Sequence, residues 1–147
     1  MGEGRPAFPT IYLALARSLA ARSTCMVDPV GAVITSVDFR KVLAIGYRGN
    51  ATGLANQCDR EGPDCGCLHG EENAVIQCDA ARSEPKIVFS TAMPCRACVK
   101  RLINLGGVQD LYIPASSAVD ASLVDLLASV NIRVQLVDDR RGGLPQG

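Results

Sequence analysis

The His and Cys residues of this chain are grouped at spacings that suit metal binding. The single His, His69, lies upstream of the pair Cys95-x-x-Cys98. Imidazole nitrogen and thiolate sulfur are ligands that zinc prefers, and two residues three apart on a helix share one face. A closed structural zinc site has four protein ligands, whereas a catalytic site has three and a water. These three residues therefore predict a zinc ion with one open coordination position.

Glu71 follows His69 closely and could move protons at such a site. A carboxylate beside a zinc-bound water can accept its proton and pass it to a ring nitrogen or a leaving amine. The order His69-x-Glu71, then Pro94-Cys95-x-x-Cys98, is typical of zinc-dependent nucleobase deaminases. The alternatives are a structural zinc site, with Glu71 an ordinary first-turn acid, and redox chemistry of the Cys-x-x-Cys pair.

The remaining cysteines suggest a second metal. Cys25, Cys58, Cys65 and Cys67 are four potential thiolate ligands, enough for a closed tetrahedral site that would tie down the loop containing three of them. The alternative is four free thiols in a reducing compartment. Cys78 is predicted to lie within a helix as a small buried core residue.

Composition indicates an intracellular protein of one domain. The chain has 147 residues and a formal net charge of zero, which gives no electrostatic reason to expect a nucleic-acid partner. No apolar run suits a signal peptide or a membrane span, so we expect a cytoplasmic protein with no membrane partner. The predicted domain spans residues 1–147, with flexible ends at 1–7 and 138–147.

The hydrophobic pattern predicts an α/β domain in which a five-stranded mixed sheet lies between helices. The expected helices cover residues 8–22, 69–82, 95–105 and 119–130, and the expected strands cover 31–37, 41–46, 87–91, 109–113 and 132–137. The first two strands should form an antiparallel hairpin, and the later ones should be parallel. Residues 47–68 are expected to form a long loop.

The chain resembles the cytidine deaminase superfamily, and within it the deoxycytidylate (dCMP) deaminases. The motifs that carry the resemblance are Val30-Gly-Ala-Val-Ile34, Gly46-Tyr47-x-Gly49, His69-Gly70-Glu71-Glu72-Asn73 and Ser90-Thr-Ala-Met-Pro-Cys95-x-x-Cys98. The resemblance implies a three-layer α-β-α fold. It also implies zinc-dependent hydrolysis of dCMP to dUMP and ammonia, in which zinc hydroxide attacks C4 of cytosine and Glu71 shuttles protons.

The resemblance also implies binding residues and partners. Gly70 would meet the base O2 through its backbone N–H, and Asn73 is typical of the dCMP group. Gly46, Tyr47 and Gly49 would lie near a site for the effectors dCTP and dTTP. The family forms homo-oligomers, here a hexamer or a dimer, and some members carry a second, structural zinc with a Cys at the position of Cys25.

Several residues depart from the family pattern. Arg48 stands where Asn is usual and is a candidate substrate-binding residue. It could bind the substrate phosphate, indicate a different substrate, or be a solvated loop residue. Gly70 replaces the usual Ala, and Val27 replaces an Arg. Two alternative functions stay open: deamination of another nucleoside, nucleotide or nucleobase, and a non-catalytic zinc- or nucleotide-binding protein.

Overall fold

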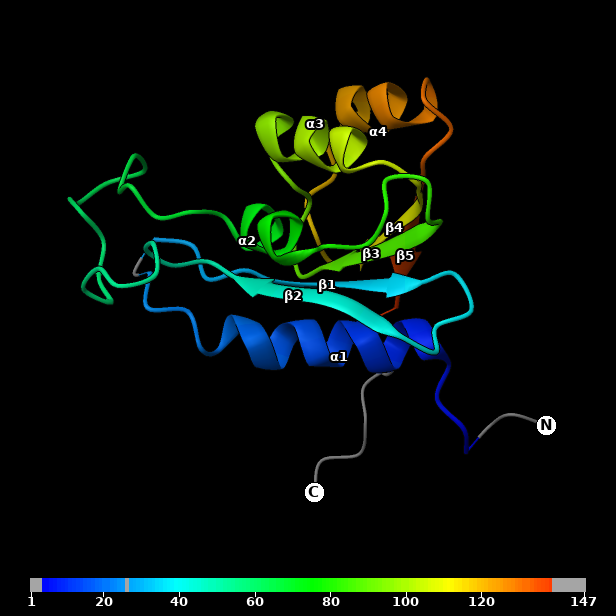
Figure 1. Cartoon of the computed structure of the whole chain (residues 1–147), viewed down its shortest axis with the longest axis horizontal. Helices are drawn as coiled ribbons and strands as arrows, with labels where there is room; N and C mark the ends of the chain where they lie inside the picture. The colour runs from blue at the N-terminus through cyan, green and yellow to red at the C-terminus, as the bar shows by residue number, and fades with distance from the viewer. Residues whose placement is uncertain (1–3, 26, 139–147) are drawn as a thin grey trace.

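The computed structural model describes residues 4–25 and 27–138 (Figure 1). Its elements in chain order are α1 (Phe8–Ala20), β1 (Gly31–Ser36), β2 (Val42–Tyr47), α2 (Gly70–Gln77), β3 (Lys86–Ser90), α3 (Arg96–Leu105), β4 (Val108–Pro114), α4 (Ala121–Ala128) and β5 (Arg133–Val137). The flexible ends predicted at 1–7 and 138–147 lie mostly outside the described residues. Within residues 4–25 and 27–138, no helix is long and apolar enough to cross a membrane.

The strands form one mixed sheet in the order β2-β1-β3-β4-β5. β1 pairs antiparallel with both β2 and β3, whereas β3, β4 and β5 are parallel. In Figure 1, α1 covers one face of the sheet and the other three helices cover the opposite face. The predicted three-layer α-β-α fold with a five-stranded mixed sheet is therefore confirmed.

The central strands are buried on both faces, and alternate side chains therefore enter two separate cores. Val33 and Phe89 pack toward α1, whereas Ile34 and Val88 belong to the larger core beneath the other helices. A strand covered on both faces needs a continuous apolar run rather than an alternating one, as these strands have. On α1, Leu13, Ala16 and Leu19 are buried, whereas Leu15 is exposed.

α2 is shorter than predicted and ends at Gln77 rather than continuing to residue 82. Cys78 is its C-cap, with extended backbone, so the prediction that this residue lies within a helix is wrong; it is half-buried and packs against the larger core. A helix that continued through residue 85 is disfavoured because Pro85 has no N–H to offer the carbonyl of Ala81. That carbonyl accepts a hydrogen bond from Lys86 instead.

Lys86 is a fully buried cation that fixes the turn between α2 and β3. Its side chain has 0% exposure, and Nζ donates to the carbonyl oxygens of Ala81 (2.7 Å), Glu84 (2.9 Å) and Gly106 (2.8 Å). Three donors thus meet three acceptors, which offsets the cost of burying the charge. The ammonium group joins the turn to the C-terminal end of α3.

Lys86→Met should destabilise the fold, because three buried carbonyl oxygens would lose their donor. We expect the free energy of unfolding to fall by about 3 kcal/mol, with the melting temperature lowered by roughly 6 to 12 °C. Lys41→Met, at an exposed lysine, is the matched control and should have little effect. Thermal and urea unfolding of both variants measure this; equal stability of the two would contradict the assigned role.

Candidate metal centres

His69, Cys95 and Cys98 come together at one point above the sheet. His69 Nδ1 lies 3.5 Å from Cys95 Sγ and 3.3 Å from Cys98 Sγ. A tetrahedral zinc ion with Zn–N near 2.0 Å and Zn–S near 2.3 Å needs a nitrogen–sulfur separation of about 3.5 Å. The three groups therefore have the spacing of zinc ligands, with room for a fourth ligand that is not a protein residue.

Two helix N-termini position these ligands. His69 is the N-cap of α2 and Cys95 is the N-cap of α3, so the first residues of both helices meet at the cluster. Glu72, which the sequence analysis did not single out, fixes His69: its carboxylate accepts from the His69 backbone N–H (3.2 Å) and pairs with Arg101 (3.0 Å). The signal was present, since an acidic residue at the third helical position is typical of a capping box.

Glu71 is buried beside the cluster. It is 4% exposed, and its Oε2 lies 3.2 Å from the hydroxyl of Ser90, a residue at the end of β3 whose role the sequence analysis also missed. Burial raises the pKa of Glu71 because it disfavours the charged form, and the Ser90 contact opposes this only in part. A carboxyl group with a raised pKa exchanges protons more readily near neutral pH.

Burial shifts the pKa values of His69 and Cys98 in opposite directions. Burial, and then the charge of Arg48, lower the pKa of His69, which favours the neutral imidazole that binds metal. Burial, and then the charge of Glu71, raise the pKa of Cys98. The thiolate of Cys98 therefore needs a cation beside it, which a divalent metal would provide.

Four of the five other cysteines form a second cluster from segments far apart in the sequence. Cys25 Sγ lies 3.7 Å from Cys65 Sγ and 3.8 Å from Cys58 Sγ, and Cys58 Sγ lies 3.7 Å from Cys67 Sγ. Sulfurs around a tetrahedral zinc ion are separated by about 3.8 Å. All four Sγ atoms lie within 4.8 Å of one another, so the donor set fits a closed zinc site.

Arg48 lies against this second cluster and is only 6% exposed, so the alternative that it is a solvated loop residue is wrong. Its Nε donates to Cys25 Sγ at 3.2 Å. Burial acts to raise the pKa of Cys25, but hydrogen bonds from the backbone of Asp28 and Val27 and from Arg48 lower it to about 6. The thiolate form is thereby favoured.

The predicted effector loop and Asn73 share one cavity of about 660 Å³, which Gly46, Tyr47, Gly49 and Asn73 help to line. The Asn73 side chain donates to the backbone carbonyl of Tyr47 at 2.9 Å, so one of its hydrogens is used within the protein. The guanidinium of Arg22 lies 5.6 Å from the centre of the Tyr47 ring and adds a positive charge to this wall.

Gly46 and Gly70 have a second, steric role. A Cβ atom on Gly46 would lie 2.4 Å from the backbone nitrogen of Ala74, and one on Gly70 would lie 2.6 Å from the carbonyl oxygen of Val30. Neither contact leaves room for a methyl group. The Gly70 that replaces the family's usual Ala is therefore required by the packing of α2 in this chain.

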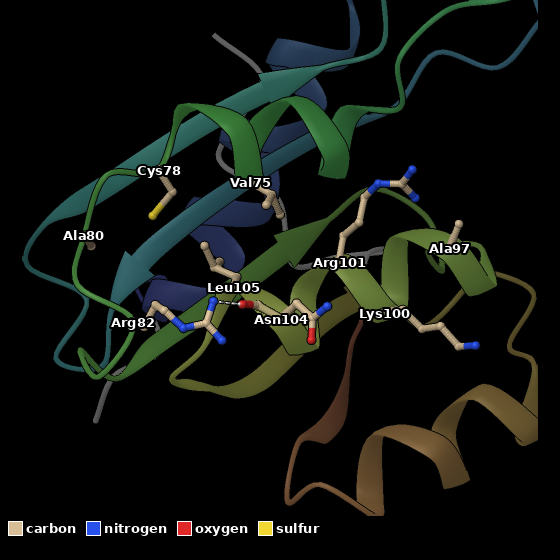
Figure 2. Close-up of a pocket in the computed structure, with 9 residues that line it drawn as sticks. All are labelled: Val75, Cys78, Ala80, Arg82, Ala97, Lys100, Arg101, Asn104 and Leu105. Carbon is tan, nitrogen blue, oxygen red and sulfur yellow. Dashed lines mark hydrogen bonds between the residues drawn. The ribbon is translucent and has the colours of Figure 1, made fainter.

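A groove of about 670 Å³ lies between α2 and α3 (Figure 2). Arg82, Lys100 and Arg101 contribute its charged side chains, and Cys78 lies at one end of it. None of its lining residues belongs to either cysteine cluster. The sequence analysis did not predict this groove, because it arises from the packing of two helices.

The family is decided by comparison with known domains. Residues 9–114 match the model of the cytidine and deoxycytidylate deaminase zinc-binding region. The chain belongs to this family. The match includes all seven cysteines and the residues of both clusters, so the deaminase region contains both candidate metal centres.

Two relatives of this chain are named deoxycytidylate deaminases. The chain is 28% identical over 145 residues to the deoxycytidylate deaminase of Schizosaccharomyces pombe, and 30% identical over 129 residues to that of Mycobacterium phage D29. The aligned region covers 89% of this chain but 44% of the yeast protein, so the chain spans less than half of that relative. For the phage protein the corresponding shares are 77% and 98%.

A solved structure supports the same assignment. The dCMP deaminase of cyanophage S-TIM5 in apo form has a TM-score of 0.74 and 25% sequence identity, over 90% of this chain and 99% of that one. A second structure of that enzyme, in complex with dCMP and dUMP, has a TM-score of 0.72, 25% identity, and coverage of 86% of this chain and 94% of that chain. The deaminase fold found here is thus shared with an enzyme of this class.

Gly70→Ala should displace the start of α2, because the new methyl group would overlap the Val30 carbonyl. We expect a loss of about 1–3 kcal/mol in the free energy of unfolding, as for other overpacked sites. Gly49→Ala is the control, since a Cβ there meets nothing closer than Thr24 Oγ1 at 3.8 Å. Urea unfolding of both variants measures the difference; a Gly70→Ala protein as stable as the wild type would contradict the packing constraint.

Proposed function

We propose that this chain catalyses zinc-dependent hydrolytic deamination of a cytosine nucleotide, with dCMP as substrate and dUMP and ammonia as products. The observation that carries the proposal is the pairing of a three-ligand cluster with a buried carboxyl group. His69, Cys95 and Cys98 have the spacing of zinc ligands, and Glu71 is 4% exposed beside them. A purely structural site has no need of an adjacent acid with a raised pKa.

Each residue has a distinct chemical role in this proposal. His69, Cys95 and Cys98 would hold zinc, which when bound supplies a Lewis acid that lowers the pKa of water. Glu71 would take one proton from the attacking water and deliver it to N3 of the base, where it stays. It would then carry the second proton, from the new hydroxyl on C4, to the departing amine, so that ammonia leaves. The N–H of Gly70 lies in the first turn of α2, where such groups have no partner within the helix, and it binds the base O2.

The relatives support dCMP as the substrate. The yeast and phage D29 relatives are named deoxycytidylate deaminases, and the cyanophage enzyme is described in complex with dCMP and dUMP. Asn73, the residue typical of the dCMP group, lies on α2 two residues after Glu71. Comparing ammonia release from dCMP, CMP, deoxycytidine and dCTP distinguishes this substrate from the alternatives.

Glu71→Gln should abolish most of the activity while leaving the metal bound. An amide cannot accept the proton, and we expect kcat on dCMP to fall by about 10²- to 10⁴-fold. Glu61→Gln, in the exposed part of the loop, is the matched control and should retain wild-type kcat. Steady-state ammonia release and zinc analysis are the measurements. Equal, wild-type activity of both variants would overturn the role of Glu71, and no turnover by the wild type on any of the four substrates, with Glu71→Gln making no difference, would favour a non-catalytic zinc protein.

The second part of the proposal is a structural zinc ion bound by Cys25, Cys58, Cys65 and Cys67. It is supported by sulfur–sulfur distances of 3.7–3.8 Å, which suit a tetrahedral metal and are far longer than a disulfide bond of about 2.0 Å. Four thiolates leave no position for water, so this metal would stabilise the loop rather than take part in the reaction.

Metal analysis tests the second site. We expect the wild type to contain about two zinc ions per chain and Cys67→Ser to contain about one, because a closed site loses its metal with a missing ligand. Cys95→Ser, at the other cluster, is the matched variant and should also lose one ion. Cys67→Ser should unfold at lower temperature; one zinc in the wild type, unchanged by Cys67→Ser, would remove the second site.

A homo-oligomer, either hexamer or dimer, and regulation by dCTP and dTTP complete the proposal. Exposed apolar side chains support self-association: Val42 and Ile45 on the edge strand β2 are 47% and 43% exposed, and Ile76 on α2 is 63% exposed. Exposed apolar side chains, above all on an unpaired edge strand, favour contact with another chain. The cavity beside Tyr47 and Arg22 has the positive charge and aromatic face that a nucleotide effector requires.

A further inference from the structure

Arg48 is a buried cation whose partners are sulfur atoms. Its Nε donates to Cys25 Sγ at 3.2 Å, its Nη2 donates to Cys65 Sγ at 3.7 Å, and its Nη1 lies 4.0 Å from the mostly exposed carboxylate of Asp28. Arginine is rarely buried without an anionic partner, because removing the charge from water is costly. The two sulfurs in direct contact must therefore supply most of the compensation.

Neutral thiols are poor partners for a guanidinium group, because an S–H sulfur is only a weak acceptor. Thiolates are much better, and four thiolates around a divalent metal carry a net charge of −2. A guanidinium beside them reduces the net charge to −1, and its charge persists at all ordinary pH values. The charges of Arg48 and a metal-filled cluster are thus complementary.

We propose that Arg48 is the counter-charge of the four-cysteine centre, a positioning residue that retains the metal by donating N–H groups to two of its sulfur ligands. The inference rests on the second metal site proposed above. It assigns Arg48 to the structural centre rather than to the phosphate of the substrate. Residues that donate to metal ligands commonly change metal affinity by about 10- to 100-fold when they are replaced.

The backbone of Arg48 is fixed independently of its side chain. Its N–H donates to the carbonyl of Val30 at 2.9 Å, and its own carbonyl accepts from the Ser23 hydroxyl at 2.6 Å. These bonds fix the backbone of Arg48 immediately after β2, and the side chain extends from this fixed position to the sulfurs. Replacing the side chain should therefore change the cluster without moving the strand.

Zinc release from the full-length protein tests the proposal. Arg48→Met removes the charge and the donors, Arg48→Lys keeps the charge but loses the fork, and Arg48→Gln keeps a donor without the charge. We expect Arg48→Met to release one of its two zinc ions at least about tenfold faster into a chromophoric chelator, and the other at the wild-type rate. The zinc release rate of Arg48→Lys should lie between those of the wild type and Arg48→Met. If Arg48→Met does not fold, Arg48→Gln takes its place as the test variant.

Two controls separate this role from general destabilisation. Arg60→Met removes an exposed arginine of the same loop that pairs with Asp64, and Lys86→Met weakens the fold at a residue that contacts neither cluster. Both should release zinc at the wild-type rate. Cobalt substitution adds a spectroscopic measurement, since the absorption of a four-sulfur cobalt site should weaken in Arg48→Met while that of the His69 site persists.

The possible outcomes distinguish the role of Arg48 from the existence of the second metal site. Two zinc ions released by Arg48→Met at wild-type rates would overturn the role of Arg48 and leave the second metal intact. If this were accompanied by a large rise in KM for dCMP, Arg48 would be a phosphate ligand instead. A wild type with one zinc, unaffected by Cys67→Ser, would overturn the second metal and the counter-charge together.

Discussion

The backbone of α2 lies directly against two other backbone segments, and this close approach determines where the cluster of His69, Cys95 and Cys98 forms. Gly46 in β2 and Gly70 at the start of α2 leave no room for a Cβ atom at either contact. Because no side chain separates the helix from the sheet at these points, α2 lies deeper than an ordinary packed helix. Its first residues, His69 and Glu71, are thereby brought level with the cysteines at the start of α3.

Burial and the positive ends of two helices have opposite effects on the ionisation of the side chains at this cluster. Two helix N-termini converge on it, and their positive ends favour thiolates and carboxylates. Burial opposes ionisation and raises the pKa of both Glu71 and Cys98. A divalent cation would reverse this effect at the sulfur, which it contacts directly. Glu71 would remain a proton carrier because it stands beside the ligands without being one of them.

Two irregular segments are held by polar or sulfur centres rather than by regular backbone hydrogen bonding. The segment between β2 and α2 extends beyond the end of the sheet in Figure 1, and the cysteine cluster and the bridge between Gly49 and Leu68 hold it. The turn after α2 is held by the ammonium of Lys86, which accommodates three carbonyl oxygens. In both cases polar or sulfur-containing side chains replace an apolar core that the local sequence cannot provide.

The sequence by itself determined the two candidate ligand sets and the order of the elements. His69, Glu71, Cys95 and Cys98 stand at helix starts whose spacing can be recognised locally, and continuous apolar runs mark strands buried on both faces. Tertiary structure alone decided that Arg48 points into the sulfur cluster, that Cys78 lies beyond its helix, and that Lys86 is buried. The physical reason is that spacing along the chain encodes contacts within one element. A contact such as that of Arg48 with Cys25, 23 residues away, depends on how separate elements pack.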